Sequence, residues 1–340
     1  MHNGHGDDIH HAKGVMLKAN FSTNVWYEAK KEIIREVITR HIDNIFHYPE
    51  PSADTLREEI AAYHGIHMEH VIAGNGSTEL FYAIAHHFAG METVIPVPSF
   101  AEYEDACRLF KHRISFVPMN EADTTRGDLM FICNPNNPNG HIWPREQIIA
   151  LLEKSPKRTL VVDESFIDFA PDAQSCIPLL LNYPNLLVVH SMTKNYAIPG
   201  LRLGYLAGGN TSLVQSIHEC QYPWSVNALS IEVGKFLLRE GRPLLPDVSR
   251  LLERKDRFTA AIASINGYTP LPSGTSFFLI KTIHDSRVLK DYLLEKRGLL
   301  IRDASNFRGL DEHYFRVNTL TEEQNNLLTE ALESFNRLKY

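Results

Sequence analysis

Short apolar runs alternate with helix-like segments along most of this 340-residue chain. An apolar run bounded by polar residues is typical of a buried strand, and such runs are found at 71–73, 93–97, 128–133, 159–162, 186–189 and 203–207. Buried strands that alternate with helices favour a mostly parallel sheet with helices on both faces. The sequence therefore predicts an α/β fold, with a three-layer αβα large domain.

The pattern changes after about residue 222. Long helical patterns follow, with strand-like runs at 276–281, 299–301 and 314–317, which indicates a second, smaller α+β domain. Ahead of the sheet, apolar residues recur at every third and fourth position of 27–46 and predict the first long helix. We therefore expect an N-terminal segment, a large domain and a small domain, at 1–30, 31–222 and 223–340.

Composition excludes several classes of protein. No stretch approaches the roughly 18 apolar residues of a membrane span, and the start of the chain lacks the features of a signal peptide. The four cysteines lie far apart, without a C-x-x-C pair, and the histidines near the start have no standard zinc spacing, so we expect a cytoplasmic protein with free thiols and no metal. The net charge of −7 argues against general nucleic-acid binding.

Ligands of parallel sheets bind at the carboxyl ends of the strands, so the residues after each apolar run are the first place to seek a site. The stretch GNGST, with Gly76 and Ser77, leads from the 71–73 run into a helix-like segment. Glycines let the backbone approach an anion, and N–H groups at a helix start attract phosphate. Ordinary helix capping by Ser77 or Thr78 is the alternative, and this stretch alone leaves both open.

Two further strand ends carry polar groups. The stretch CNPNNPNG, which contains Asn137, fixes its backbone with two prolines and leaves amides to point at a partner, although a structural turn is the commoner use. Asp163 directly follows the 159–162 run, and a carboxylate at a buried strand end is costly unless a cation or strong donor meets it. A helix N-cap or an ion pair is the alternative for Asp163.

The fourth strand end, SMTKNYAIPGLRLGYL, places Lys194 after the 186–189 run, where a solvent-seeking lysine is not expected. Ser191, Thr193 and Arg202 lie beside it in sequence. Together the four ends supply donors for a phosphate, a hydrogen-bonding amide, a buried acid and a buried amine. Pyridoxal phosphate uses all of these, because it needs a lysine for its aldehyde, an acid for its ring nitrogen and donors for its phosphate.

With these motifs the chain resembles the fold-type I pyridoxal-phosphate enzymes of aminotransferase class I and II over most of its length. The resemblance implies that Lys194 forms an imine with the cofactor, that Asp163 pairs with the pyridine nitrogen and that Asn137 bonds the phenolic oxygen. Phe100, in VPSFAEY, would stack on the ring. Many members carry a tyrosine three residues after the aspartate; Phe166 stands there in this chain and removes one bond to that oxygen.

The resemblance also implies a phosphate site and a homodimer. The implied phosphate ligands are Gly76, Ser77, Ser191, Thr193 and Arg202. Tyr48, in HYPEP, matches a tyrosine that reaches across the dimer interface to the cofactor phosphate of the other subunit. The active sites would then lie at the interface.

Substrate-binding residues follow from the same resemblance. Arg316, in YFRVNTL, matches the arginine that binds the substrate α-carboxylate, for which a bidentate fork is well suited. Arg302 is the candidate for a substrate phosphate. His5, Gly6 and Asn24 belong to the N-terminal stretch that is expected to fold over the active site.

Two branches of the family, threonine-phosphate decarboxylases and histidinol-phosphate aminotransferases, take phosphorylated substrates. The stretches TKNYAIPGLRLGYL, YPWSVNAL, DESFIDF and PSFAEY favour the decarboxylases. The implied reaction converts L-threonine O-3-phosphate to (R)-1-amino-2-propanol O-2-phosphate for cobalamin synthesis, and amino transfer from histidinol phosphate to 2-oxoglutarate is the alternative. The chain departs from the decarboxylase pattern N-x-N-P-L-G at Asn24-Val25-Trp26-Tyr27 and has Asn139 in place of the usual threonine.

A function of another class, a ligand sensor of this fold joined to a DNA-binding module, is disfavoured. Such proteins carry an additional helix-turn-helix region, and the roughly 25 residues ahead of the first long helix are too few to hold one.

Overall fold

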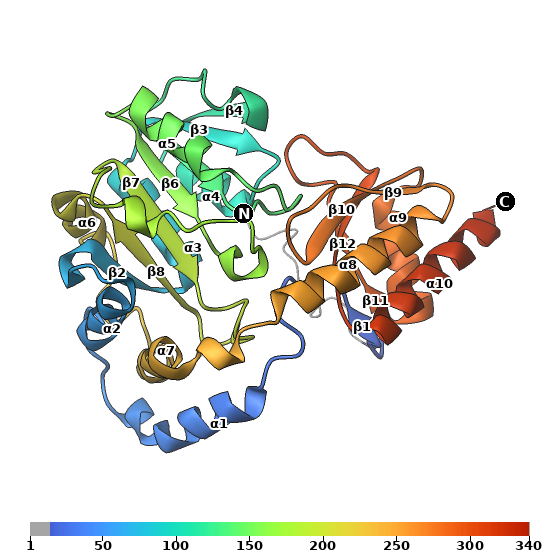
Figure 1. Cartoon of the computed structure of the whole chain (residues 1–340), viewed down its shortest axis with the longest axis horizontal. Coiled ribbons are helices and arrows are strands. Elements are labelled where there is room, and N and C mark those ends of the chain that lie inside the picture. Colours follow the sequence, from blue (N-terminus) through green and yellow to red (C-terminus); the bar gives the residue numbers. More distant parts are fainter. Residues whose placement is uncertain (1–13, 340) are drawn as a thin grey trace.

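The computed structural model describes residues 14–339, which form a three-layer α/β unit and a smaller α+β unit side by side (Figure 1). This arrangement confirms the predicted fold class. The division at residues 31 and 223 remains our proposal for the domain boundaries. Within residues 14–339, no helix is both long enough and apolar enough to cross a membrane.

The large sheet has seven strands in the order β2-β8-β7-β6-β5-β3-β4. Their bounds are β2 (Val71–Asn75), β3 (Glu92–Val97), β4 (Arg113–Pro118), β5 (Leu129–Cys133), β6 (Thr159–Asp163), β7 (Leu186–Ser191) and β8 (Leu203–Gly208). The strands β3 to β7 pair in parallel, whereas β8 runs antiparallel to both of its neighbours. The carboxyl ends of β5, β6 and β7 therefore meet at one edge, where Cys133 lies opposite Asp163 in the register.

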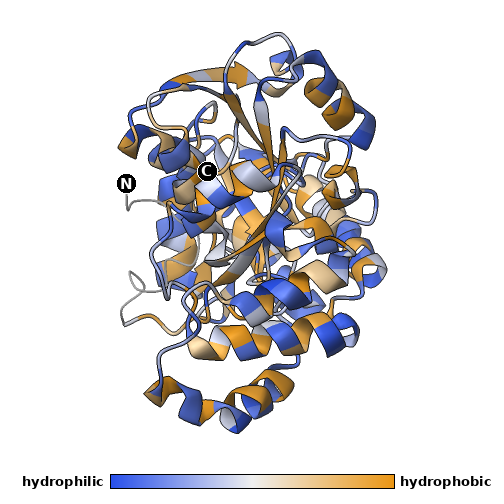
Figure 2. Cartoon of the chain, turned by 90° about the vertical axis from the view of Figure 1, so that its left-hand side faces the viewer, coloured by the Kyte–Doolittle hydropathy of each residue, from blue (hydrophilic) through white to orange (hydrophobic). Residues whose placement is uncertain are grey.

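Helices cover both faces of this sheet. The helices are α1 (Lys31–Arg40), α2 (Asp54–His64), α3 (Gly76–His87), α4 (Ala101–Leu109), α5 (Arg145–Lys154), α6 (Thr211–His218) and α7 (Ala228–Glu240). Because side chains alternate along a strand, Val161 belongs to the core cluster that includes residues of α3, α4 and α6, and Val162 to the one that includes residues of α2, α5 and α7. Helix α1 packs on α7. Figure 2 shows the strands as mostly hydrophobic and the outer helices as mixed, as expected for half-buried helices.

The small sheet is antiparallel, in the order β12-β13-β10-β9. Its strands are β9 (Tyr268–Pro270), β10 (Phe277–Thr282), β12 (Arg302–Asp303) and β13 (Tyr314–Asn318), and its helices are α8 (Val248–Ala263), α9 (Ser286–Tyr292) and α10 (Glu322–Lys339). The N-terminal strand β1 (Ala19–Asn20) pairs in parallel with β11 (Leu299–Leu300). This pairing ties the start of the described chain to the small sheet's unit and leads it toward the strand ends of the large sheet.

Three elements differ from the sequence prediction. The expected helix at 27–46 is divided into α1 and a 3-10 helix, η2 (Ile42–Phe46), whose apolar residues stay exposed rather than extending the core-facing stripe. The run 299–301 is divided between β11 and the approach to β12. The edge strand β4 was not predicted, because its alternating, half-exposed residues lack the continuous apolar run of a central strand.

A buried ion pair joins the ends of β6 and β7 on the face covered by α2 and α7. His190 Nε2 lies 2.7 Å from Glu164 Oε2, and the imidazole stacks on the ring of Tyr205. Burial alone lowers the pKa of His190, but the hydrogen bond and charge of Glu164, with Asp168 and Asp163 nearby, outweigh it and raise that pKa. The neighbouring His64, which bonds the hydroxyl of Tyr205, has a pKa lowered to about 4 by burial and by His190.

The His190–Glu164 pair predicts a pH-dependent stability. A raised pKa in the folded state stabilises the fold fully below the unfolded-state pKa of about 6.5, and this stabilisation is lost as the pH rises through the folded pKa. We expect wild type to exceed His190→Gln in thermal midpoint by several degrees near pH 6, and the difference to shrink toward about pH 9. Calorimetry at a series of pH values measures this difference, in which titrating groups remote from His190 cancel.

His67→Gln is the matched control, because His67 and its partner Glu69 are both exposed. Its midpoint should follow that of wild type at every pH. A wild-type advantage over His190→Gln that stays constant from about pH 6 to about pH 9 would contradict the buried, charged imidazole.

Candidate active site

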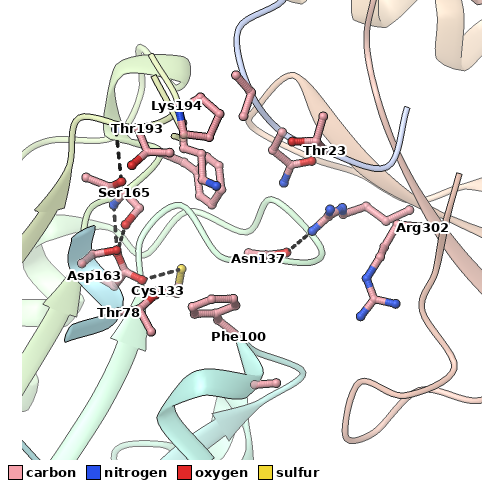
Figure 3. A pocket seen from close by; sticks show the side chains of 18 of the residues that line it. Thr23, Thr78, Phe100, Cys133, Asn137, Asp163, Ser165, Thr193, Lys194 and Arg302 are labelled. Atoms are coloured by element: carbon pink, nitrogen blue, oxygen red, sulfur yellow. Dashed lines mark hydrogen bonds between the residues drawn. The ribbon is translucent and has the colours of Figure 1, made fainter. Parts of the chain in front are cut away.

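A cavity lies between the carboxyl edge of the large sheet and the small sheet (Figure 3). It brings together most of the residues that the sequence indicated: Asn24, Ser77, Phe100, Asn137, Asp163, Ser191, Thr193, Lys194, Arg202, Arg302 and Arg316. In Figure 3, Asp163, Thr193 and Lys194 lie on one side and Arg302 on the other, with Asn137 between them. The four strand ends therefore converge as parallel-sheet topology requires.

Asp163 ends β6 and is almost completely buried. Its Oδ1 accepts hydrogen bonds from the N–H (2.9 Å) and hydroxyl (2.5 Å) of Ser165, and its Oδ2 accepts one from the hydroxyl of Tyr103 (2.5 Å). Burial raises the pKa of the Asp163 carboxyl, while the donors of Ser165 and Tyr103 oppose that rise. These neutral donors favour the ionised form of Asp163 and so counter part of the effect of burial on its pKa.

Asn137 is oriented by an arginine. Arg316 Nη1 donates to the side-chain oxygen of Asn137 at 2.5 Å, and Nη2 donates to the backbone oxygen of Ser22 at 2.7 Å. Because a guanidinium can only donate, the atom of Asn137 that faces it must be oxygen, and the amide nitrogen is left to donate elsewhere. The arginine of the small sheet thus fixes which end of the Asn137 amide a ligand meets.

The other asparagines of CNPNNPNG hold the turn itself. Asn134 exchanges hydrogen bonds with the backbone of Trp143, and Asn136 donates to the backbone oxygen of Pro98 and the side chain of Asn139. The stretch therefore serves both expected uses, with Asn137 facing the cavity and its neighbours building the loop.

The start of α3 forms one wall of the cavity. The N-cap residue Asn75 makes no side-chain capping bond, and both Ser77 and Thr78 line the cavity in the first turn. Gly76 has φ +77°, and a Cβ there would lie 2.6 Å from Nη2 of Arg202. This close approach, together with the helix-start N–H groups, makes an anion-binding corner, so the phosphate interpretation is favoured over ordinary capping.

Lys194 follows β7 on a loop that the N-terminal segment holds. The N–H of Trp26 donates to the backbone oxygen of Lys194 at 2.9 Å, and the N–H of Ile198 donates to that of Thr193 at 3.1 Å. Asn195, the next residue, donates to the carboxylate of Asp168 on the opposite side of the loop. The backbone of the lysine loop is thus fixed from two directions while the Lys194 side chain reaches the cavity.

Buried polar atoms in the cavity test whether pyridoxal phosphate, the cofactor expected from the sequence, suits it. Thr193 Oγ1, Arg316 Nε and Asn24 Oδ1 are buried and have no hydrogen-bond partner in the part of the chain that the structure describes. A buried polar group without a partner is costly, so these atoms indicate a polar ligand. The residues present fit the cofactor: an amine, a carboxylate, a directed amide, an aromatic face and an anion-binding corner.

Two arginines lie side by side on neighbouring strands of the small sheet. Arg302 of β12 pairs directly with Arg316 of β13 in the antiparallel register, and both line the cavity. Burial and the charge of Arg302 lower the pKa of Arg316 to about 9. Two guanidinium groups on one wall of a cavity favour an anionic ligand.

Some residues of this site were not predicted. Tyr103 and Ser165, the donors to Asp163, were missed, and so was Cys133, whose thiol lies 3.9 Å from Asp163 Oδ2. A signal for Tyr103 was present, because it follows Phe100 by three positions on α4 and so shares its face. Using that signal would have required knowing that the helix begins at Ala101.

Four predicted residues are not among those that line this cavity. Gly76 lies directly beside it, one position before Ser77. Tyr48 is 88% exposed and lies against the ring of Trp224, at 5.6 Å between ring centroids. His5 and Gly6 lie outside the described residues. In residues 14–339, no group of three or more His, Cys, Asp and Glu side chains could hold a metal ion.

Comparison with known proteins agrees with this geometry. A family model described as aminotransferase class I and II matches residues 16–332. Threonine-phosphate decarboxylase of Salmonella typhimurium is 32% identical over 349 residues, which cover 97% of this chain and 96% of the relative. A histidinol-phosphate aminotransferase of Caldanaerobacter subterraneus is 30% identical over 322 residues, covering 90% and 89%. The crystal structure of L-threonine-O-3-phosphate decarboxylase from Porphyromonas gingivalis superposes with a TM-score of 0.91 at 38% identity, covering 94% of this chain and 99% of that chain.

The contact between Tyr103 and Asp163 predicts the effect of removing one hydroxyl. Tyr103→Phe keeps the stacking on Phe131 but takes a donor from the buried carboxylate, so the pKa of Asp163 rises further. We expect the dissociation constant for added pyridoxal 5′-phosphate to rise roughly tenfold or more, as a charge-assisted hydrogen bond of about 1.5–3 kcal/mol implies. A spectroscopic titration of the apoprotein measures it.

Tyr82→Phe is the control, because the Tyr82 hydroxyl also donates to a carboxylate, that of Glu102, but joins α3 to α4 and lies outside the cavity. Its affinity for the cofactor should equal that of wild type. Equal affinities in wild type and Tyr103→Phe would show that Tyr103 does not support the carboxylate.

Proposed function

This chain belongs to the aminotransferase class I and II family, and we propose that it decarboxylates L-threonine O-3-phosphate. The family assignment also makes it a pyridoxal-phosphate enzyme, so its cofactor is pyridoxal 5′-phosphate. The observation that carries the proposed substrate is the pair Arg302 and Arg316 on one wall of the cavity, which calls for two anionic groups on one small molecule.

We assign the cofactor contacts as follows. Lys194 carries the cofactor through Nζ, Asp163 accepts the N–H of its ring, Asn137 donates to its phenolic oxygen and Phe100 covers the ring face. The phosphate lies at the start of α3 and the lysine loop, against Gly76, Ser77, Ser191, Thr193 and Arg202. The unpartnered Thr193 Oγ1 supports this placement.

L-Threonine O-3-phosphate matches the two arginines. Its α-carboxylate would be bound by Arg316, whose Nε has no partner among the described residues, and its phosphate by Arg302. Asn24, with an unpartnered Oδ1 in the same cavity, would contact the substrate from the N-terminal segment. The relatives that carry the decarboxylase name, at 32% identity in sequence and 38% in structure, support this substrate.

Bound pyridoxal phosphate supplies an electron sink for the substrate Cα. The chain would select which bond is broken: by holding the substrate carboxylate, Arg316 would orient the Cα–carboxylate bond so that it breaks, carbon dioxide leaves and the electron pair stays on Cα. Asp163 keeps the ring nitrogen protonated throughout. Lys194, or a donor beside it, then delivers a proton to Cα, which yields (R)-1-amino-2-propanol O-2-phosphate, a precursor for cobalamin synthesis.

Amino transfer from histidinol phosphate to 2-oxoglutarate is the second candidate, supported by a relative at 30% identity. Histidinol phosphate has a phosphate but no carboxylate, so it would leave one arginine of the pair without an anion. The second substrate of that reaction, with two carboxylates, would satisfy both arginines. The arginine pair therefore suits both reactions, and the decarboxylase relatives at 32% and 38% identity favour the first.

We propose that the enzyme is a cytoplasmic homodimer. Large apolar and aromatic side chains are exposed around η2 and the 222–224 turn: Ile45, Phe46, Tyr48, Tyr222 and Trp224. An exposed patch of this kind marks an interface, and a second copy would bring its Tyr48 to the cofactor phosphate. The four free cysteines support a reducing compartment.

Lys194 can be identified directly. Borohydride reduction of the holoenzyme should fix the cofactor to the peptide that contains Lys194, abolish the visible absorbance and leave the mass of one reduced cofactor on that peptide. Lys194→Ala should retain no cofactor after dialysis. Lys255→Ala, which removes another partly buried lysine, should keep the wild-type spectrum. A labelled peptide elsewhere in the chain would show that the lysine was misassigned.

The reaction can be tested with substrate alone. Purified enzyme mixed with L-threonine O-3-phosphate, without a keto acid, should release carbon dioxide and the phosphorylated aminopropanol in equal amounts. Arg302→Gln should raise KM for this substrate roughly 10- to 100-fold, because a charge-assisted contact to the phosphate is lost, and should leave cofactor affinity unchanged. Arg297→Gln, at an exposed arginine of the same unit, is the control.

Formation of glutamate from histidinol phosphate and 2-oxoglutarate, without release of carbon dioxide from the threonine phosphate, would replace the decarboxylase by the second candidate. Equal KM values for wild type and Arg302→Gln would remove Arg302 from the substrate phosphate site.

A further inference from the structure

A bidentate ion pair connects the two units beside the cavity. Arg308, in the loop after β12, donates from Nε to Oε2 of Glu104 at 3.0 Å and from Nη2 to Oε1 at 2.7 Å. Glu104 belongs to α4, on the large sheet. The guanidinium also lies over the ring of Phe116 of β4, at 3.9 Å from its centroid. One side chain of the small unit thus has two independent contacts on the large unit.

The loop that carries Arg308 also contacts the side chain of Arg302, the arginine proposed for the substrate phosphate. Arg302 Nη2 donates to the side-chain oxygen of Asn306 at 2.9 Å, and the Arg302 guanidinium lies 5.0 Å from the ring centroid of Phe307. Phe307 and Arg302 both line the cavity. Residues 303–310, which we call the arginine loop, therefore set where the Arg302 head group lies.

The other end of the ion pair reaches the cofactor side of the cavity. Helix α4 begins directly after Phe100, contributes Ala101 to the cavity wall and carries Tyr103, which donates to Asp163. In the arginine loop, Gly309 has φ +86°, and a Cβ there would lie 3.8 Å from Val97 at the carboxyl end of β3. The loop therefore packs along the mouth of the site, where β3 gives way to α4.

We propose that Arg308 and Glu104 form a latch that holds the arginine loop over the cavity and so positions Arg302 for the phosphate of the substrate. The assignment of that phosphate rests on the proposed function. Arg308 is 45% exposed, and an ion pair at such a site adds little to the stability of the fold. The two parallel hydrogen bonds between Arg308 and Glu104 instead fix the position of the arginine loop on the large unit. Arg308 and Glu104 are therefore positioning residues rather than catalytic ones.

Glu104 offers a control within the same carboxylate. Arg108, one helical turn later on α4, also donates to Glu104 Oε1, at 2.7 Å, but this contact lies within one helix and joins nothing across the cavity. Arg108→Gln removes an ion-pair partner of Glu104 and leaves the latch. Glu104→Gln removes the charge of the latch at constant side-chain size. Arg308→Gln removes it with a shorter side chain and also loses the contact on Phe116.

Steady-state kinetics of the holoenzyme test the positioning. Arg308→Gln and Glu104→Gln should each raise KM for L-threonine O-3-phosphate about threefold to tenfold, with kcat and cofactor affinity within about twofold of wild type. The double variant should be no worse than Arg308→Gln alone, because Arg308→Gln already removes the ion pair with Glu104 together with the contact on Phe116. Arg308→Lys, which keeps the charge but not the fork, should recover part of the loss, and Arg108→Gln should match wild type.

Hydrogen exchange provides a readout that does not depend on the substrate. Amides of residues 303–310 should exchange faster in Arg308→Gln and Glu104→Gln than in wild type or Arg108→Gln, while the strands of the large sheet remain unchanged. Unchanged exchange in both latch variants would overturn the proposal. So would faster exchange without a change in KM when wild type is active. If wild type does not turn over L-threonine O-3-phosphate, the proposed function is refuted. The exchange data alone would then show whether Arg308 and Glu104 hold the arginine loop.

Discussion

The buried carboxylate of Asp163 is the constraint on which the site depends. A charge at the end of a central strand is costly, and the chain stabilises it with three neutral hydrogen bonds, two from Ser165 and one from Tyr103. Those donors come from the turn after β6 and from α4. The same contacts that favour the charged form of the acid therefore also fix the turn and the helix that begins directly after Phe100. The contacts that set the charge next to the cofactor ring therefore also set the positions of the cavity walls.

The substrate side is arranged around a second electrostatic constraint. Arg302 and Arg316 are neighbours in the small sheet, and the buried Arg316 is partly neutralised by the oxygens of Asn137 and Ser22. Because Asn137 belongs to the large unit and Ser22 to the N-terminal segment, Arg316 connects three parts of the chain at the cavity. The contacts of Asn137 link the orientation of a cofactor-facing amide to the arginine proposed for the substrate carboxylate.

The sequence predicted the fold class and most of the cavity because both follow from local rules. Apolar runs specify the central strands, and parallel strands bring Asp163, Asn137 and Lys194 to one edge whatever the loops do. Edge strand β4 and the division of 27–46 into α1 and η2 were missed because they depend on which residues the tertiary structure leaves exposed. The partners of a strand-end residue, such as Tyr103 for Asp163, depend on packing between distant segments and cannot be read from spacing alone. The role expected of Tyr48 would need a second copy of the chain, which one chain cannot test.

The central claim is that Asp163 stays ionised in its buried position and keeps the cofactor ring nitrogen protonated. Nitrogen-15 NMR of the enzyme reconstituted with pyridoxal 5′-phosphate labelled at that nitrogen measures the protonation state directly. The account predicts the chemical shift of a protonated pyridinium in wild type near neutral pH, and that of a neutral pyridine in Asp163→Ala. A neutral pyridine in the wild-type enzyme would contradict the account.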